Sequence, residues 1–230
     1  MPAAKFIVID TETSGLFDFA KPADAPGQPR MASLAMLFCD AELQLDHAYH
    51  ALIRPEGWVM DAETAKLHGL TQEKLAAEGI PVRDALGAYA EAVDWGHAVI
   101  AYNAQYDTKI LRGEFRRAGL ADRFETTVNI DCMRPCVGVC KIPKAKGGGY
   151  KFPKLIEAYR HFYQRDPAGQ HDALADAHAC LAIAQALQRI GCLPEAAVHY
   201  ARNRPDAPAP GKAVARDPVT GAAADPADIF

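Results

Sequence analysis

The chain has 230 residues, of which 50% are hydrophobic and 23% are charged, and its formal net charge is −4 at pH 7. This composition is typical of one globular domain with an extension, and the negative charge excludes an overall basic coat for nucleic acid, though not a local basic groove. No apolar run approaches the roughly 18 residues that cross a membrane. With no signal-peptide pattern and no extracellular cysteine spacing, we expect reduced thiols in a cytoplasmic protein.

The first predicted element is a buried strand that ends in two acids. Phe6 to Ile9 are all apolar, and Asp10 and Glu12 follow directly. Alternation along a strand places both carboxylates on one face, roughly 7 Å apart along the backbone. Divalent cations held by carboxylate oxygens are the usual compensation for such like charges. The alternative is an exposed strand edge at which the acids are simply solvated.

The rest of the chain predicts an α/β layer architecture. Residues 17–30 are rich in proline and should form a loop. Further strands are predicted at 31–39, 47–53, 98–102 and 126–130. Helices are predicted from Asp61 to a stop at Gly69, and at 82–93, 103–118, 131–139, 153–163 and 173–190. The chain begins with strands, continues with alternating strands and helices and ends with helices. This order indicates a mixed sheet between layers of helices.

The C-terminal part differs in composition from the rest of the chain. From Pro205 onward, 13 of 26 residues are Pro or Ala, and few large apolar side chains remain. Such a segment cannot bury enough apolar surface to offset the entropy that ordering costs. We therefore expect a domain over residues 1–195 and a disordered tail over 196–230. The last residues, Asp228-Ile229-Phe230, are either an unstructured end or a short peptide that docks on a partner.

Two further acidic elements follow predicted strands or begin helices. Asp107 lies one turn into a helix and shares its face with Ile110 and Leu111, where an unpaired carboxylate would be costly; an interaction with the helix dipole is the alternative. His171 and Asp176 are five apart, so they share a site only if His171 lies at or before the first helical turn. That arrangement suits a proton-carrying histidine beside a metal ligand, while each residue alone could be an ordinary surface group.

Taken together, the three elements resemble the DEDDh exonucleases, which are DnaQ-like members of the ribonuclease H-like superfamily. The resemblance rests on Asp-x-Glu after the first strand, on Asn-Ala-x-x-Asp at a helix start and on His-x4-Asp on a late helix, and it covers about Lys5 to Ile190. It implies a ribonuclease H-like α/β fold with a five-stranded mixed sheet of order 3-2-1-4-5, strand 2 antiparallel, flanked by helices. Tyr102 departs from the His that many members carry before Asn-Ala.

The resemblance also implies a reaction, namely hydrolysis of phosphodiester bonds from the 3′ end of nucleic acid to release nucleoside 5′-monophosphates. Two divalent ions, Mg²⁺ or Mn²⁺, would be held by four carboxylates, with His171 as general base. The four carboxylates are Asp10, Glu12, Asp107 and Asp176. We expect DNA with single-stranded or frayed ends. An exoribonuclease is the alternative, and a non-catalytic module that binds nucleic acid or a polymerase is a third.

Five residues are predicted to contact substrate because they match positions with that role in the family. Thr13 would bind the terminal sugar hydroxyl and Leu16 would lie under the last base, although Leu16 could equally belong to the core. Glu63 and His68 look like the family's substrate-contacting segment, and His68 could instead complement a helix C-terminus. Asn103 is expected to cap its helix and to face the substrate. A polymerase or repair protein in trans is a conceivable partner, and the oligomeric state is left open.

The basic segment and the cysteine-containing segment can each be interpreted in two ways. Six basic residues between Lys141 and Arg160 could hold phosphates or could form a solvated loop. Three arginines on the Asp107 helix are expected to face solvent, namely Arg112, Arg116 and Arg117. The cysteines at 132, 136 and 140 could suggest a metal site, but their spacing favours small buried residues on one helix face.

Overall fold

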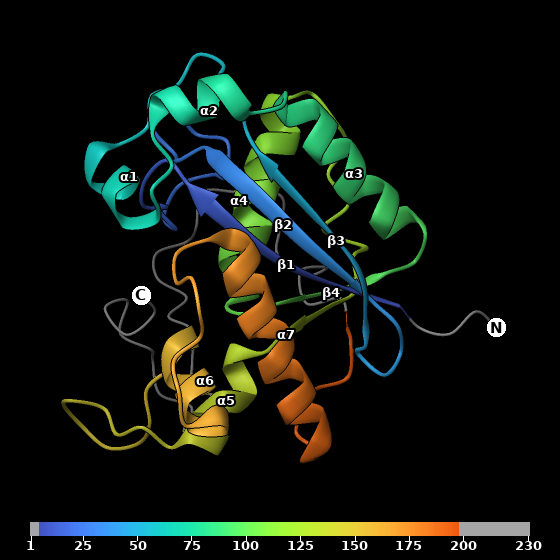
Figure 1. The fold of residues 1–230 in the computed structure, drawn as a ribbon, viewed down its shortest axis with the longest axis vertical. Helices are drawn as coiled ribbons and strands as arrows, with labels where there is room; N and C mark the ends of the chain where they lie inside the picture. The colour runs from blue at the N-terminus through green and yellow to red at the C-terminus, as the bar shows by residue number, and fades with distance from the viewer. Residues whose placement is uncertain (1–4, 198–230) are drawn as a thin grey trace.

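The computed structural model describes residues 5–197, and these form a sheet with helices on both faces (Figure 1). The strands are β1 (Phe6–Thr13), β2 (Met31–Cys39), β3 (Leu45–Leu52), β4 (Ala98–Ala101) and β5 (Asn129–Asp131). The sheet order is β3-β2-β1-β4-β5, in which β2 is antiparallel to β1 and β3, and β4 runs parallel to β1 and β5. The predicted order and the antiparallel second strand are confirmed.

Seven helices complete the described part of the chain. They are α1 (Ala62–His68), α2 (Gln72–Glu78), α3 (Val82–Asp94), α4 (Ala104–Arg117), α5 (Met133–Cys140), α6 (Leu155–Tyr163) and α7 (Ala173–Arg189). As predicted, the Asp61 side chain caps α1 by accepting a hydrogen bond from the Thr64 amide, and Gly69 ends this helix in the left-handed conformation at φ 72°.

Two elements differ from the prediction. Helix α2 was not predicted; it begins where the Thr71 side chain accepts a hydrogen bond from the Lys74 amide, and it buries only Leu75. One buried side chain leaves too weak an apolar pattern to reveal a helix of two turns. Strand β5 begins at Asn129 and not at 126, because the amides of Thr126 and Thr127 turn back to the Arg123 carbonyl.

The core lies on both faces of the sheet, and β1 contributes to each in alternation. Ile7 and Ile9 pack with the layer of α3 and α4, while Val8 packs with the layer of α5, α6 and α7. Figure 1 shows α7 across one face of the sheet, with α3 and α4 on the other. Side chains that follow Val8 at intervals of two therefore point toward α7, and those that follow Ile9 point toward α4.

The predicted loop 17–30 is ordered and is attached to α4. The buried Gln28 side chain accepts a hydrogen bond from the Asp18 amide and donates to the Asp18 and Pro22 carbonyls. The loop approaches α4 so closely that a Cβ on Gly113 would lie 2.4 Å from the Ala23 carbonyl oxygen. Glycine at position 113 is therefore required by the contact between the loop and the helix.

The expectation that three arginines of α4 face solvent is wrong. The side chains of Arg112, Arg116 and Arg117 are only 12%, 23% and 19% exposed. The first two pair with Asp122 at 3.1 Å, and Arg117 lies 3.4 Å from the buried Glu114. Asp122, beyond the end of the helix, and Glu114, on α4 itself, draw these long side chains along the surface of the helix.

Cys132 and Cys136 are buried and Cys140 is partly buried, as expected of small residues on one helix face.

Within residues 5–197, no helix is long and apolar enough to cross a membrane. The predicted tail lies outside the described residues from position 198 onward, so the domain boundary after residue 195 stays a prediction.

Candidate active site

Three carboxylates converge where β1 ends and α7 begins. Asp10 and Glu12 lie on the face of β1 that α7 covers, and Asp176 lies in the first turn of α7. One oxygen from each of the three side chains lies within 4.8 Å of the others. Oxygen ligands at this separation are what a hard divalent cation needs. Asp10, Glu12 and Asp176 could therefore hold a metal ion together.

Asp107 reaches the same region from the opposite layer. Its side chain is 3% exposed, and its Oδ1 accepts two hydrogen bonds from Thr11, at 3.0 Å from the amide and 2.8 Å from the hydroxyl. It lies outside the group of three, yet its charge contributes to raising the pKa of Asp10. The position in the first helical turn suits the helix dipole, but the direct bonds to β1 determine where this carboxylate points.

Each carboxylate of this cluster makes the ionised form of its neighbours less favourable. Burial, and then the charges of Asp107 and Asp176, raise the pKa of Asp10 well above its usual range. Burial, together with the neighbouring acids, raises the pKa of Glu12 to about 8. Burial also raises the pKa of Asp107 to about 7, although its bonds to Thr11 oppose the change. The charges that act most on Asp10 and Glu12 are all negative, so a bound cation would relieve the repulsion.

His171 lies beside Asp176, two residues before α7 begins. Its amide donates to Asp176 Oδ2 at 3.2 Å, and its backbone is left-handed at φ 61°. The Asp172 side chain caps α7 by accepting a hydrogen bond from the Ala175 amide at 3.0 Å. His171 thus meets the condition that its spacing from Asp176 imposes, and its side chain is exposed to solvent.

His68 supports the end of β1. Its Nδ1 accepts a hydrogen bond from the Leu70 amide at 3.1 Å, so the ring proton is on Nε2, which donates to the Thr13 carbonyl at 3.1 Å. Burial lowers the pKa of His68, which favours this neutral form. Since both ring nitrogens are engaged within the protein, the structure favours His68 as a support for Thr13 over a hydrogen-bonding contact to substrate.

Thr13 has a second partner, Tyr106, which the sequence did not single out. The Thr13 hydroxyl oxygen lies 2.8 Å from the Gly15 carbonyl and 2.9 Å from the Tyr106 hydroxyl. Burial raises the pKa of Tyr106 to about 12. The available signal was its place in Asn-Ala-Gln-Tyr-Asp, directly before Asp107.

Leu16 and Glu63 line one groove, whose lining begins at Ser14 just after β1. Leu16 is 81% exposed, which excludes its alternative place in the core. Glu63 is also exposed, where it pairs with Lys66 at 2.6 Å. The groove has a volume of about 1100 Å³ between loop 17–30 and α1, and the exposed side chains of Val59 and Leu67 line it as well. It offers an apolar surface next to the end of β1.

Asn103 stands at the N-cap position of α4, as predicted, but its side chain makes no capping hydrogen bond. Its contact with substrate stays a prediction. Its backbone is left-handed at φ 62°, and its amide donates to Asp131 Oδ1 at 3.1 Å. The same oxygen accepts a hydrogen bond from the Met133 amide at 3.0 Å. Asp131, at the end of β5, therefore stabilises the starts of two helices.

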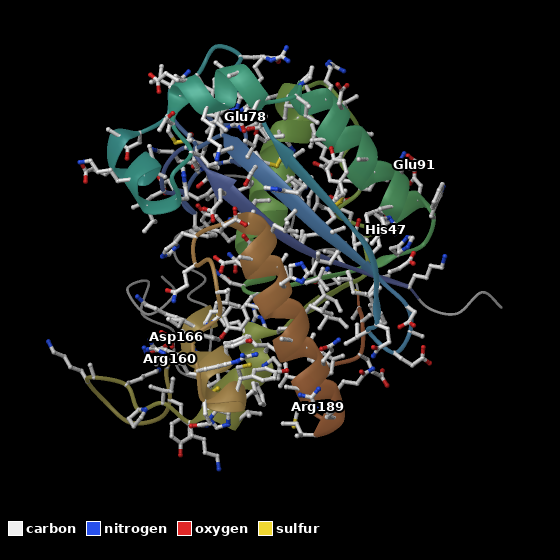
Figure 2. All side chains as sticks on the ribbon, viewed as in Figure 1. His47, Glu78, Glu91, Arg160, Asp166 and Arg189 are labelled. Atoms are coloured by element: carbon white, nitrogen blue, oxygen red, sulfur yellow. The ribbon has the colours of Figure 1, made fainter. Side chains whose placement is uncertain are left out.

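The basic segment from Lys141 to Arg160 is partly neutralised by acids. Lys151 pairs with Glu157 at 2.8 Å, and Arg160 pairs with Asp166, as Figure 2 shows for the labelled residues. Residues 141–150 extend away from the body of the protein in Figure 1. Exposed lysines such as Lys141 and Lys146 remain able to meet phosphate, although no contact joins them to the acids in the described structure.

Comparison with known proteins agrees with this geometry. The family model RNase_T, described as exonuclease, matches residues 7–184. The uncharacterized exonuclease CP81 of Escherichia phage 186 is 28% identical over 188 residues, which cover 80% of this chain and 89% of that protein.

Solved structures show the same fold. E. coli exonuclease I in complex with a dT13 oligonucleotide matches with a TM-score of 0.62 and 18% identity, covering 80% of this chain and 41% of that one. A 3′-exonuclease described in 3′-end specific recognition of a histone mRNA stem-loop matches with a TM-score of 0.65 and 15% identity, over 84% and 85% of the two chains. The chain thus spans less than half of exonuclease I. Because the family model covers most of the chain, and the sheet order and acid cluster agree with it, the chain belongs to the RNase_T exonuclease family, the DnaQ-like 3′–5′ exonucleases of the ribonuclease H-like superfamily.

Proposed function

We propose that this exonuclease removes nucleoside 5′-monophosphates from single-stranded or frayed 3′ ends of DNA, with two divalent metal ions and with His171 as general base. The observation that carries the proposal is the convergence of Asp10, Glu12 and Asp176, and the lining of a large groove begins at Ser14, two residues after Glu12. A strand whose last bases lay in this groove would bring its terminal phosphodiester toward the acids, which is the arrangement that cleavage of a terminal nucleotide requires.

The residues fit a metal centre. Asp10, Glu12 and Asp176 offer converging oxygens, and Asp107 supplies a fourth carboxylate from α4. All-oxygen ligands suit Mg²⁺ or Mn²⁺. When bound, two such ions supply charge neutralisation on the attacking and the leaving oxygen of the phosphodiester. The raised pKa values of Asp10 and Glu12 support this assignment, since burial and neighbouring negative charges make a cation favourable there.

His171 would accept the proton of the attacking water. Its exposed side chain can reach solvent, and its amide is fixed to Asp176, so the proton acceptor and the carboxylate cluster are held together. The water oxygen would bond to phosphorus as the bond from phosphorus to the 3′ oxygen breaks, which leaves a 3′-hydroxyl on the shortened strand. Replacing His171 with glutamine should lower kcat by about 10²–10⁴ while KM changes little, because only proton transfer is lost.

The groove would hold the bases of the last nucleotides. Leu16, Val59 and Leu67 are 81%, 79% and 58% exposed, which is unusual for side chains of this size. Apolar side chains can contact any base, so the groove accepts a strand without reading its sequence. Duplex DNA would have to fray before its bases could enter, which is why we favour single-stranded ends.

An RNA substrate is the second candidate. The structural neighbour that recognises a histone mRNA stem-loop covers the chain as well as exonuclease I does, so fold similarity favours neither nucleic acid. We favour DNA because the ordered insertion 17–30 lies beside the groove, whereas enzymes dedicated to very short RNA oligomers are compact. The choice rests on a direct comparison of rates.

The experiment uses 5′-labelled single-stranded DNA and RNA of one sequence, incubated with the protein and Mg²⁺ or Mn²⁺. A ladder that shortens from the 3′ end, and that is lost with EDTA or with Asp10→Asn, is the expected result. Asp84→Asn, which removes an exposed acid on α3, is the matched control and should keep full activity. Faster shortening of RNA would replace DNA as the substrate, and intact substrates with either metal would refute the proposal.

A further inference from the structure

The lysine-rich segment between α5 and α6 is a formed hairpin. Residues 141–151, the arm, contain four lysines and no acidic residue, in a chain whose formal net charge is −4. The Lys151 amide donates to the Ile142 carbonyl at 2.9 Å, and the Lys144 amide donates to the Gly149 carbonyl at 3.2 Å. These bonds join the two limbs of the arm, so its lysines are presented on a defined extension of the protein.

Both limbs of the arm are attached at the edge of the sheet where the acids lie. Strands β1, β4 and β5 are parallel, so their carboxyl ends share this edge. The outgoing limb continues from α5, which begins two residues after Asp131 at the end of β5 and spans about 12 Å over its eight residues. The returning limb leads to Pro153, whose carbonyl accepts a hydrogen bond of 2.7 Å from the Tyr102 hydroxyl, directly after β4. Tyr102, at which this chain departs from many members of the family, therefore anchors the arm.

Most lysines of the arm are free to bind a ligand. Lys151 pairs with Glu157 at 2.8 Å, whereas the other three lysines of the arm form no ion pair within residues 5–197. The ring of Tyr150, on the returning limb, is 39% exposed. Figure 1 shows the arm extending from the body of the protein. Cations that meet phosphates, together with an aromatic ring that can stack on a base, are what proteins use to bind a single strand.

The acids explain why a long strand needs such a surface. Through bound metal, Asp10, Glu12 and Asp176 can place counter-charge at the cleaved phosphodiester alone. Phosphates further along the strand approach a chain of net negative charge, and they need cations of their own to be held. The unpaired lysines of the arm supply such cations beyond the sheet edge.

We propose that the arm is a second binding site for the substrate strand, in which Lys141, Lys144 and Lys146 hold backbone phosphates several nucleotides to the 5′ side of the cleaved bond. The inference rests on the proposed function, because it assumes a nucleic-acid strand whose 3′ end lies at the acids. It adds that the arm supplies affinity for long strands, so the protein discriminates between substrates by strand length.

The test compares steady-state kinetics on two substrates in the presence of Mg²⁺. One is single-stranded DNA of about 20 nucleotides, which exceeds the roughly 4–16 nucleotides that a single-strand site covers. The other is the p-nitrophenyl ester of thymidine 5′-monophosphate, which offers one phosphodiester and no strand for the arm. The double variant Lys141→Gln/Lys146→Gln should raise KM for the long strand about five- to tenfold, as the loss of two exposed ion pairs allows. Its kcat on the strand and its rate on the ester should be unchanged, because only binding is lost.

The dependence on salt provides a second measurement. Each phosphate contact to a single strand contributes about −0.7 to the slope of log(kcat/KM) against log salt concentration, so loss of two contacts should make the slope shallower by about 1.4. Lys5→Gln/Lys74→Gln is the matched control, since it removes the same charge from two exposed residues, one directly before β1 and one on α2. The control should keep the wild-type KM and slope, and thermal unfolding verifies that both double variants are folded.

Failure of the inference and failure of the proposed function give different results. A wild-type KM and salt slope in the arm variant would overturn the inference, while shortening of the strand from its 3′ end would leave the proposed function standing. Equal losses on the ester and on the strand would also overturn the inference, because the arm would then support the carboxylate site and not hold the strand. A wild-type protein that cleaves neither substrate would overturn the proposed function and this inference with it.

Discussion

Replacing Glu12 with glutamine should stabilise the metal-free protein at alkaline pH even as it removes activity. The two side chains have nearly the same size, so the change chiefly removes charge. The pKa of Glu12 is raised from 4.5 to about 8 by burial and by the neighbouring carboxylates. When folding raises the pKa of an acid, the free energy of unfolding is unaffected below the pKa that the acid has in the unfolded protein. The free energy of unfolding then falls as pH rises toward the pKa in the folded protein. The loss therefore spans about pH 4.5 to 8.

The size of the effect follows from the same values. A change from 4.5 to about 8 corresponds to a ceiling of about 5 kcal/mol. Glu12 is partly exposed and titrates together with its neighbours, so solvent screening and shared protonation reduce the expected gain to about 2 kcal/mol. For a domain of this length, about 2 kcal/mol raises Tm by about 4–8 °C.

Thermal unfolding followed by circular dichroism in EDTA measures the effect. At pH 8.5, Glu12→Gln should unfold above the wild type by this amount, and the difference should shrink toward zero near pH 4.5. Glu91→Gln, which alters an exposed acid on α3 far along the chain from the cluster, is the matched control and should change Tm little. Saturating Mn²⁺ should raise the Tm of the wild type and have less effect on the variant. A lower Tm for Glu12→Gln in EDTA at pH 8.5 would refute the reasoning, because it would mean that the folded protein already compensates the charge of Glu12.

Two further predictions concern the attachment of loop 17–30. Gly113→Ala should destabilise the protein by about 1–3 kcal/mol in a urea titration, because the new Cβ would lie 2.4 Å from the Ala23 carbonyl oxygen. Gly138→Ala in α5 is the control, since a Cβ there meets nothing within 4 Å, and this change should be neutral or stabilising. Glu114→Ala should cost about 3–5 kcal/mol in that assay, because the buried carboxylate binds Arg30 through two hydrogen bonds of 2.7 and 2.9 Å, and an equal midpoint to the wild type would contradict this account.

Local patterns in the sequence were sufficient for the parts of the fold that depend on local physics. The alternating burial of β1 follows from its pattern of side chains. The cap of α1 at Asp61 and its left-handed end at Gly69 each follow from a residue type that favours that backbone position. The grouping of Asp10 and Glu12 on one face required only the period of two along a strand. The sheet order came from family resemblance, since periodicity alone does not say which strands are neighbours.

The parts that local patterns missed depend on partners far along the chain. Asn103 was expected to cap α4 with its side chain, but that bond is absent, and its backbone amide is held by Asp131 at the end of β5. Arg117 looked like a surface residue, yet its guanidinium donates to the Ala23 carbonyl of loop 17–30 at 3.2 Å. In each case the tertiary fold supplied a hydrogen-bond partner that no window of neighbouring residues contains.

The acidic strand end organises both layers of the site. Asp10 and Glu12 point toward α7, where they meet Asp176. The residues between and after them point toward α4, where Thr11 binds Asp107 and Thr13 binds Tyr106. A shift of one residue in the register of β1 would exchange these two faces, and the acids and their supports would be lost together. The register of β1 against β2 therefore sets the stability of the sheet and also the geometry of the carboxylate cluster.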